Sequence, residues 1–125
     1  MPTVTIGVPP DTLRVNRRLG RQWVSSHADK TRYQQDVFRA WKTAGCPVMQ
    51  PPWPVHLYVT LYLGKGQRCD AVDALTWCKA GLDSLTGVAG IAPDDGASYI
   101  CPVTVDVGRD RERPRIELRW QEETE

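Results

Sequence analysis

Hydrophobic and polar side chains alternate most regularly over residues 55–63, VHLYVTLYL. This alternation predicts a strand with one buried face, because successive side chains of a strand point to opposite sides of the sheet. Shorter alternating runs predict three further strands at residues 4–8, 103–107 and 116–120. The expected buried positions of the longest strand are Val55, Leu57, Val59, Leu61 and Leu63, with His56, Tyr58, Thr60 and Tyr62 on the other face.

Two other segments repeat their apolar residues at helical spacing. The first predicts a helix over about residues 28–44, ended by Gly45. The arginine-rich segment 11–26 before it suggests an ordered loop or an irregular hairpin. The second predicts a helix over about residues 73–86. Its expected buried stripe consists of Leu75, Cys78, Leu82 and Leu85.

The order strand, helix, strand, helix, strand, strand predicts an α+β domain, a small mixed β-sheet with two main helices packed on it. The charged segment GRDRERP, residues 108–114, suggests a hairpin connection between the last two strands. A chain of 125 residues is long enough for one core, so residues 1–125 are expected to form a single domain.

The composition, 41% hydrophobic and 25% charged, is that of a soluble globular protein. No apolar run reaches the roughly 20 residues that cross a bilayer, and the polar start does not resemble a signal peptide. We therefore expect a cytoplasmic protein without a membrane partner. The four cysteines contain no CxxC pair, which predicts free thiols. A zinc site that includes His27 or His56 stays open as an alternative.

The net charge of +1 hides an uneven distribution of charged residues. Residues 1–45 contain eight lysines and arginines but three acids, whereas residues 70–95 contain five aspartates and one lysine. A basic half beside an acidic segment is typical of a metal enzyme that binds a polyanion, although such segregation also occurs in proteins without this function.

The acids surround the second expected helix. Asp70 and Asp73 fall at or before its first turn, where unpaired backbone N–H groups favour carboxylates, and Lys79 and Asp83 are spaced to pair. Taken alone, these residues make a helix cap and a surface ion pair, and PDDG at 93–96 makes a turn. Taken together, the acids could converge on Mg²⁺, which prefers carboxylate oxygens, beside a lysine that reaches a phosphate. This inventory indicates metal-assisted phosphodiester hydrolysis.

The same residues carry a resemblance that covers almost the whole chain. Its elements, in order, are VTIGVPP, NRR at 16–18, a helix with Tyr33 near its start, Pro54-Val55, Arg68-x-Asp70, Lys79, Asp83 and Asp94-Asp95. In this order and spacing the chain resembles the RusA-type Holliday-junction resolvases, small bacterial and prophage endonucleases. In the family's common form the lysine stands closer to the first acid than Lys79 does to Asp70. Asp73 is therefore a second possible start of the motif, and the longer spacing of phage-borne relatives favours Asp70.

The resemblance implies a set of metal ligands. Asp70 and Asp95 would be the principal Mg²⁺ ligands, and Mn²⁺ is a plausible substitute. Asp73 would be a third ligand or an outer-shell partner, and Asp94 could serve as a ligand or only as a turn residue.

The remaining implied roles concern the catalytic lysine and the DNA contacts. Lys79 would orient the attacking water or stabilise charge on the scissile phosphate, and Asp83 would fix Lys79. The candidates for DNA contacts are Arg14, Asn16, Arg17, Arg18, Arg21, Lys65 and Arg68.

The expected function is that of a Mg²⁺-dependent, structure-selective endodeoxyribonuclease. It would resolve four-way DNA junctions by paired symmetric nicks, in recombination and repair. The resemblance implies a RusA-like homodimer, which would present two matched sites to the two equivalent strands; Phe38, Trp41 and Trp77 are interface candidates. Two alternatives stay open: a non-catalytic branched-DNA-binding protein on the same fold, or a metal nuclease that acts on other branched nucleic acids.

Overall fold

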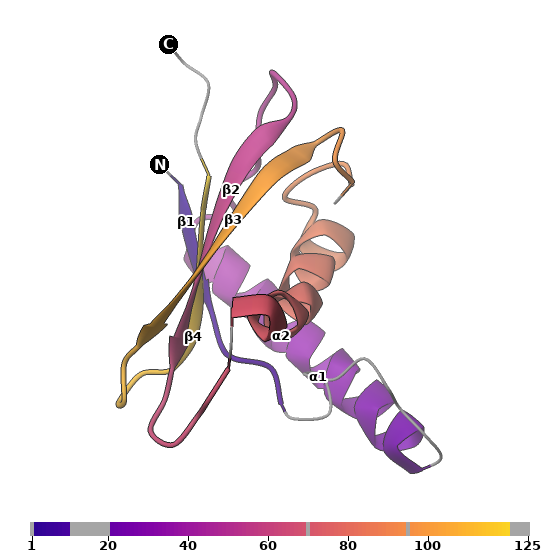
Figure 1. Ribbon diagram of the computed structural model, residues 1–125. Coiled ribbons are helices and arrows are strands. Elements are labelled where there is room, and N and C mark those ends of the chain that lie inside the picture. Colours follow the sequence, from indigo (N-terminus) through magenta and orange to yellow (C-terminus); the bar gives the residue numbers. More distant parts are fainter. Residues whose placement is uncertain (1, 11–20, 70, 95, 121–125) are drawn as a thin grey trace.

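The chain folds as an α+β domain with a four-stranded mixed sheet and two main helices (Figure 1). The structure, a computed structural model, describes residues 2–10, 21–69, 71–94 and 96–120, without the side chains of residues 21–26, 71–73 and 88. Its elements are β1 (Thr3–Ile6), α1 (Arg21–Thr43), β2 (Val55–Leu63), α2 (Ala71–Ser84), the π-helical turn η2 (Leu85–Ala89), β3 (Ile100–Arg109) and β4 (Arg115–Trp120). This confirms the expected fold class and the order of the elements.

The strands are arranged in the order β1-β4-β2-β3. β3 pairs parallel to β2, and β4 pairs antiparallel to β2 and to β1. The expected hairpin between β3 and β4 is therefore wrong, because β2 lies between them. The crossover through α2 and η2 lets β3 pair in parallel along one edge of β2. The other edge of β2 is then left for β4, and the connection between β3 and β4 passes the end of β2.

The core lies between one face of the sheet and the helices, which are both on the same side of it (Figure 1). All five predicted apolar positions of β2 are buried, and its alternate side chains are half-buried, which confirms the predicted pattern. The helices contribute Tyr33 and Val37 from α1 and Ala74 and Cys78 from α2. No helix in the part of the chain that the structure describes is long and apolar enough to cross a membrane.

The helices differ from their predictions in extent and in burial. α1 begins at Arg21, so the last six residues of the predicted loop over 11–26 are helical. RQWVSS shows no regular apolar stripe, the signal by which a helix is recognised from sequence. In α2, Leu75 is 52% exposed, so its assignment to the buried stripe is wrong. The buried stripe instead includes two small residues, Ala74 and Gly81, which let α2 approach its neighbours closely.

Candidate functional site

Some of the predicted site residues lie within the described ranges of the structure, and others lie outside them. Those outside the described residues are Arg14, Asn16, Arg17, Arg18, Asp70 and Asp95. For Arg21 and Asp73 only the backbone is described, within α1 and α2 respectively. Within the described residues, the candidate site consists of Lys65, Arg68, Lys79, Asp83 and Asp94 and of the elements that hold them. The convergence of the metal ligands stays a prediction.

Lys79 and Asp83 form the predicted pair on α2. The Lys79 Nζ lies 3.6 Å from Asp83 Oδ1, and the side chains are 68% and 39% exposed. An ion pair this exposed adds little to the free energy of unfolding. The pair therefore leaves the Lys79 ammonium at the protein surface, where a ligand could reach it.

The turn that begins at Gly96, shortly after Asp94, is anchored against the start of the sheet. The backbone N–H groups of Tyr99 and Ile100 both donate to the Gly96 carbonyl at 3.0 Å. The N–H of Val55, the first residue of β2, donates in turn to the Tyr99 carbonyl at 2.8 Å. This turn lies between the segment that contains the exposed Asp94 and the first residues of β2 and β3. The turn predicted at 93–96 includes Asp95, which lies outside the described residues, so it stays a prediction.

The sequence predicted a metal-ligand cluster of aspartates and left a zinc site with cysteine and histidine ligands open as an alternative. No group of three or more His, Cys, Asp or Glu side chains within the described ranges could hold a metal ion. All four cysteines, which lie inside those ranges, are free thiols, as predicted. His56 instead bonds the Thr104 hydroxyl at 2.7 Å and stacks on Tyr58, with ring centroids 4.0 Å apart. The zinc alternative therefore has no support in the described residues.

The connection from β2 to α2 carries the two exposed basic residues Lys65 and Arg68. It begins with a tight turn, in which the Gly64 N–H donates to Gln67 Oε1 at 2.6 Å and the Gln67 N–H donates to the Gly64 carbonyl at 3.2 Å. Gly66 has a φ of 77°, a left-handed conformation that glycine adopts without steric cost. This connection leads directly into Asp70 and α2.

Arg109, at the end of β3, holds that connection from the side. Its Nη1 donates to the Gly64 carbonyl at 2.9 Å, and its Nη2 donates to the Gln67 carbonyl at 3.0 Å. The Asp110 N–H also donates to the Leu63 carbonyl at 3.0 Å. The sequence interpretation missed Arg109, because it treated residues 108–114 as a hairpin and no local pattern relates them to a loop 42 to 45 residues earlier.

The connection from β3 to β4 is closed by Asp110 and Arg115. One oxygen of Asp110 accepts from the N–H groups of Glu112 and Arg113 at 3.2 Å each, and the other accepts from Arg115 at 2.8 Å. The hydrogen bond from Arg115 holds the pKa of Asp110 below its ordinary value of 3.8. Arg115 also donates to Glu117 at 2.9 Å and lies 4.0 Å from the centre of the Tyr62 ring.

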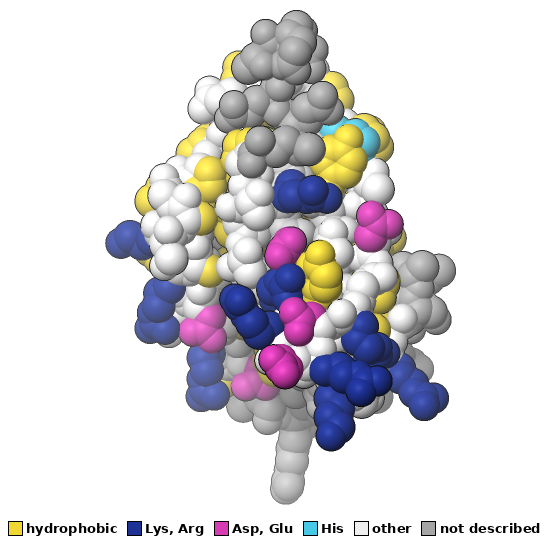
Figure 2. Space-filling model, turned by 90° about the vertical axis from the view of Figure 1, so that its left-hand side faces the viewer, with side chains coloured by type: hydrophobic (Ala, Val, Ile, Leu, Met, Phe, Trp, Pro, Cys, Tyr) yellow, Lys and Arg dark blue, Asp and Glu magenta, His cyan; other side chains and the backbone are white. Residues whose placement is uncertain are grey.

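Together the two connections form a basic surface, which we call the basic loop pair (residues 64–68 and 109–115). It contains six lysines and arginines and two acids. The two connections lie side by side at the lower end of the sheet in Figure 1. Figure 2 shows Lys and Arg side chains gathered in the lower half of the neighbouring sheet face, with fewer carboxylates among them. Such a surface attracts polyanions.

No protein-family model and no curated protein matches this chain. The resemblance to RusA-type resolvases therefore stays a prediction. What the structure adds to it is a firmly held basic connection directly before the acid-rich start of α2.

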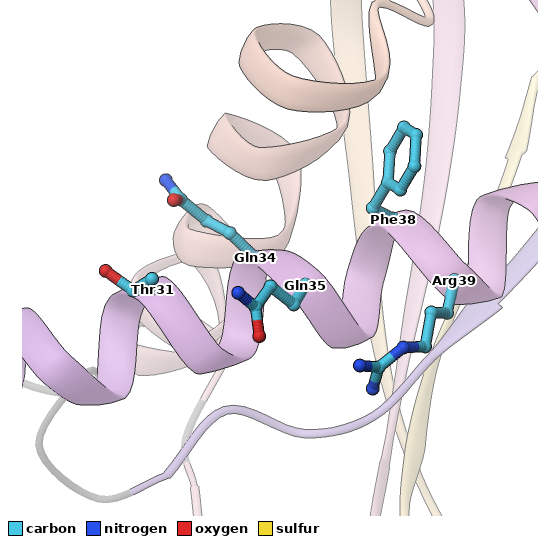
Figure 3. A pocket seen from close by; sticks show the side chains of 5 residues that line it. All are labelled: Thr31, Gln34, Gln35, Phe38 and Arg39. Carbon is cyan, nitrogen blue, oxygen red and sulfur yellow. The ribbon is translucent and has the colours of Figure 1, made fainter.

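The aromatic residues proposed for a dimer interface have partners within their own chain. Trp41 Nε1 donates to the Pro47 carbonyl at 2.8 Å, and both Trp41 and Trp77 pack against the core. Phe38 lies at a hollow of about 450 Å³ along α1 (Figure 3). The hollow is lined by Thr31, Gln34, Gln35, Phe38 and Arg39. Because Arg39 pairs with Asp36 and the other lining groups are neutral, the hollow offers no hydrolytic constellation.

Proposed function

We propose that this protein is a Mg²⁺-dependent, structure-selective endodeoxyribonuclease that nicks four-way DNA junctions. One observation carries the proposal: Arg109 clamps the basic connection that runs straight into Asp70 and α2. Two cations on a connection that is held in this way, next in sequence to the predicted acids, can bind a DNA strand and hold its phosphate near the proposed metal ligands. The proposed place of action is the cytoplasm, where such DNA is found in a bacterial cell.

The proposed active site combines the predicted acids with the described pair on α2. Asp70 and Asp95 are the proposed Mg²⁺ ligands, with Asp73 as a third. The metal, when bound, would supply an activated water and neutralise charge on the phosphate. Lys79 would contact the phosphate or the water from the exposed side of α2, and Asp83, 3.6 Å away, would limit the positions of its ammonium.

We propose that the active form is a homodimer. A four-way junction offers two equivalent strands, and a two-fold dimer presents one active site to each of them. Phe38 remains the best interface candidate of the three predicted residues, because Trp41 and Trp77 pack against their own core whereas Phe38 lies at an open hollow. Analytical ultracentrifugation of wild type and Phe38→Ser tests this, and a wild type that stays monomeric with the junction bound contradicts it.

The experiment that tests the function is cleavage of a labelled four-way junction beside a linear duplex of the same sequence. Wild type, Asp70→Asn and a control, Asp36→Asn, are compared in Mg²⁺, Mn²⁺ and EDTA. Asp36 is an exposed acid that pairs with Arg39 at 3.2 Å on α1, so its substitution removes the same charge elsewhere. We expect paired, metal-dependent nicks in the junction for wild type and the control, and none for Asp70→Asn.

The outcomes separate this proposal from its alternatives. Junction binding without cleavage in any metal would refute the nuclease and leave a DNA-binding protein on the same fold. Cleavage of flaps or RNA in preference to four-way junctions would keep the metal chemistry and refute the proposed substrate.

A further inference from the structure

We propose that the connection between β3 and β4 is a second DNA-backbone-binding element, in which Arg111 and Arg113 contact phosphates and Arg109 holds the element beside Lys65 and Arg68. The choice of DNA as the ligand rests on the proposed function. The assignment of these residues rests on the geometry of the basic loop pair.

The first line of evidence is that the two connections touch. A Cβ placed on Gly64 would lie 3.1 Å from Pro114 Cγ and 3.2 Å from Pro114 Cβ. Arg109 adds two hydrogen bonds across the same contact, to the carbonyls of Gly64 and Gln67. The cations of both connections therefore belong to one continuous surface.

The second line of evidence is that the β3–β4 connection is organised before any ligand binds. Asp110 accepts from two backbone N–H groups of the connection and from the guanidinium of Arg115. Arg111 and Arg113 project from this closed turn as exposed side chains. A preorganised turn loses less conformational entropy on binding than a flexible one, which favours ordered contacts with a ligand.

The third line of evidence is that some arginines of the basic loop pair are bonded within the protein whereas others are exposed. Both terminal nitrogens of Arg109 donate to backbone carbonyls, and Arg115 pairs with Asp110 and Glu117. These two guanidinium groups therefore stabilise the structure of the two connections. The other four cations of the basic loop pair are exposed, so a ligand can reach them: Lys65, Arg68, Arg111 and Arg113. A group of exposed cations fits a ligand of repeated anions, and the arginine fork matches phosphate oxygens.

The binding test uses fluorescence anisotropy of a labelled four-way junction in EDTA, so that metal binding and cleavage play no part. The double variant Arg111→Gln/Arg113→Gln is compared with Arg39→Gln/Lys42→Gln, which removes two exposed positive charges from α1. Each is titrated at several salt concentrations. For two lost phosphate contacts, the slope of log K against log salt falls in magnitude by about 1.8. We expect this fall for the loop variant and none for the control.

Equal behaviour of the two double variants would overturn the proposal, because Arg111 and Arg113 would then add only general charge. Displacement of the junction by polyglutamate as readily as by unlabelled duplex would also overturn it, since the surface would then not distinguish a phosphate backbone from other polyanions. If wild type and the two double variants bind as expected here but wild type does not cleave the junction in Mg²⁺, the nuclease is refuted and this proposal stands.

The role of Arg109 is tested by measurements that distinguish positioning of residues 64–68 from direct contact with a phosphate. We expect Arg109→Gln to accelerate amide hydrogen exchange over residues 64–68, while Arg111→Gln leaves it unchanged. We also expect Arg109→Gln alone to weaken junction binding. Added to the variant Lys65→Gln/Arg68→Gln, it should weaken binding little further, because the connection then has no cations left to position. Unchanged exchange, with a salt slope lowered by about one, would show that Arg109 contacts phosphate itself and would overturn its positioning role.

Discussion

The substitution Gly81→Ala tests how closely α2 packs against its neighbours, because it has two opposing effects on the free energy of unfolding. Gly81 is buried on the inner face of α2. A Cβ at this position would overlap Cδ1 of Ile6 in β1 and lie 3.3 Å from the Tyr33 hydroxyl of α1. That hydroxyl donates to the Gly7 carbonyl at 2.6 Å, so it is held in place. Gly81→Ala therefore pushes α2 away from both neighbours.

The magnitudes predict that packing outweighs helix propensity. Alanine is more favourable than glycine inside a helix by about 0.8–1 kcal/mol. Overpacking a core costs about 1–3 kcal/mol. Ile6 is 2% exposed and Tyr33 is 5% exposed, so neither side chain can move toward solvent without disturbing other core residues. The two ranges leave a net loss of at most about 2 kcal/mol. Because Ile6 and Tyr33 are both held in place, we expect Gly81→Ala to lower the free energy of unfolding by about 1–2 kcal/mol, the upper part of that range.

The matched control is Gly87→Ala in η2. Gly87 is exposed, and a Cβ there meets no atom within 4 Å, so only the gain in backbone propensity remains. We expect no loss of stability for this variant. Urea unfolding followed by far-UV circular dichroism measures both variants, with the m-value as a check on two-state behaviour. A Gly81→Ala protein as stable as wild type would refute the close seating of α2 on Ile6.

Three further predictions follow from the described contacts. Lys79→Ala should change the free energy of unfolding by less than about 0.5 kcal/mol, because the ion pair is exposed. If Lys79 has the proposed catalytic role, the same variant should lower junction cleavage at least about 100-fold. A fall in cleavage no larger than the fall in the amount of folded protein would refute that proposed role. Burial beside Cys69 raises the pKa of the Cys78 thiol to about 12, so a thiol reagent at pH 8 should label exposed Cys46 in the folded protein and Cys78 only in urea. Since the Asp110 pKa is lowered in the folded state, its contribution to stability is present above its ordinary value of 3.8 and fades as pH falls below it. Arg115→Gln should flatten the pH dependence of Tm in that acid range, and a curve parallel to wild type would contradict this.

The local patterns of the sequence determined the elements and some of their faces. The period-2 alternation of residues 55–63 predicted a strand, its bounds and all of its buried positions, because a strand's geometry alone decides which side chains share a face. The four-residue spacing of Lys79 and Asp83 likewise predicted their pairing, since one helical turn brings them together.

The tertiary structure decided what depends on residues far apart in the chain. β3 and β4 read as a hairpin because they are adjacent in sequence, but the crossover through α2 gave β3 one edge of β2 and left the other to β4. Leu75 is exposed because α2 rests on its small residues instead. The clamp between Arg109 and Gly64 spans 45 residues and has no sequence period. Periodicity records how one element meets its surroundings, whereas only the packed chain determines which elements meet each other.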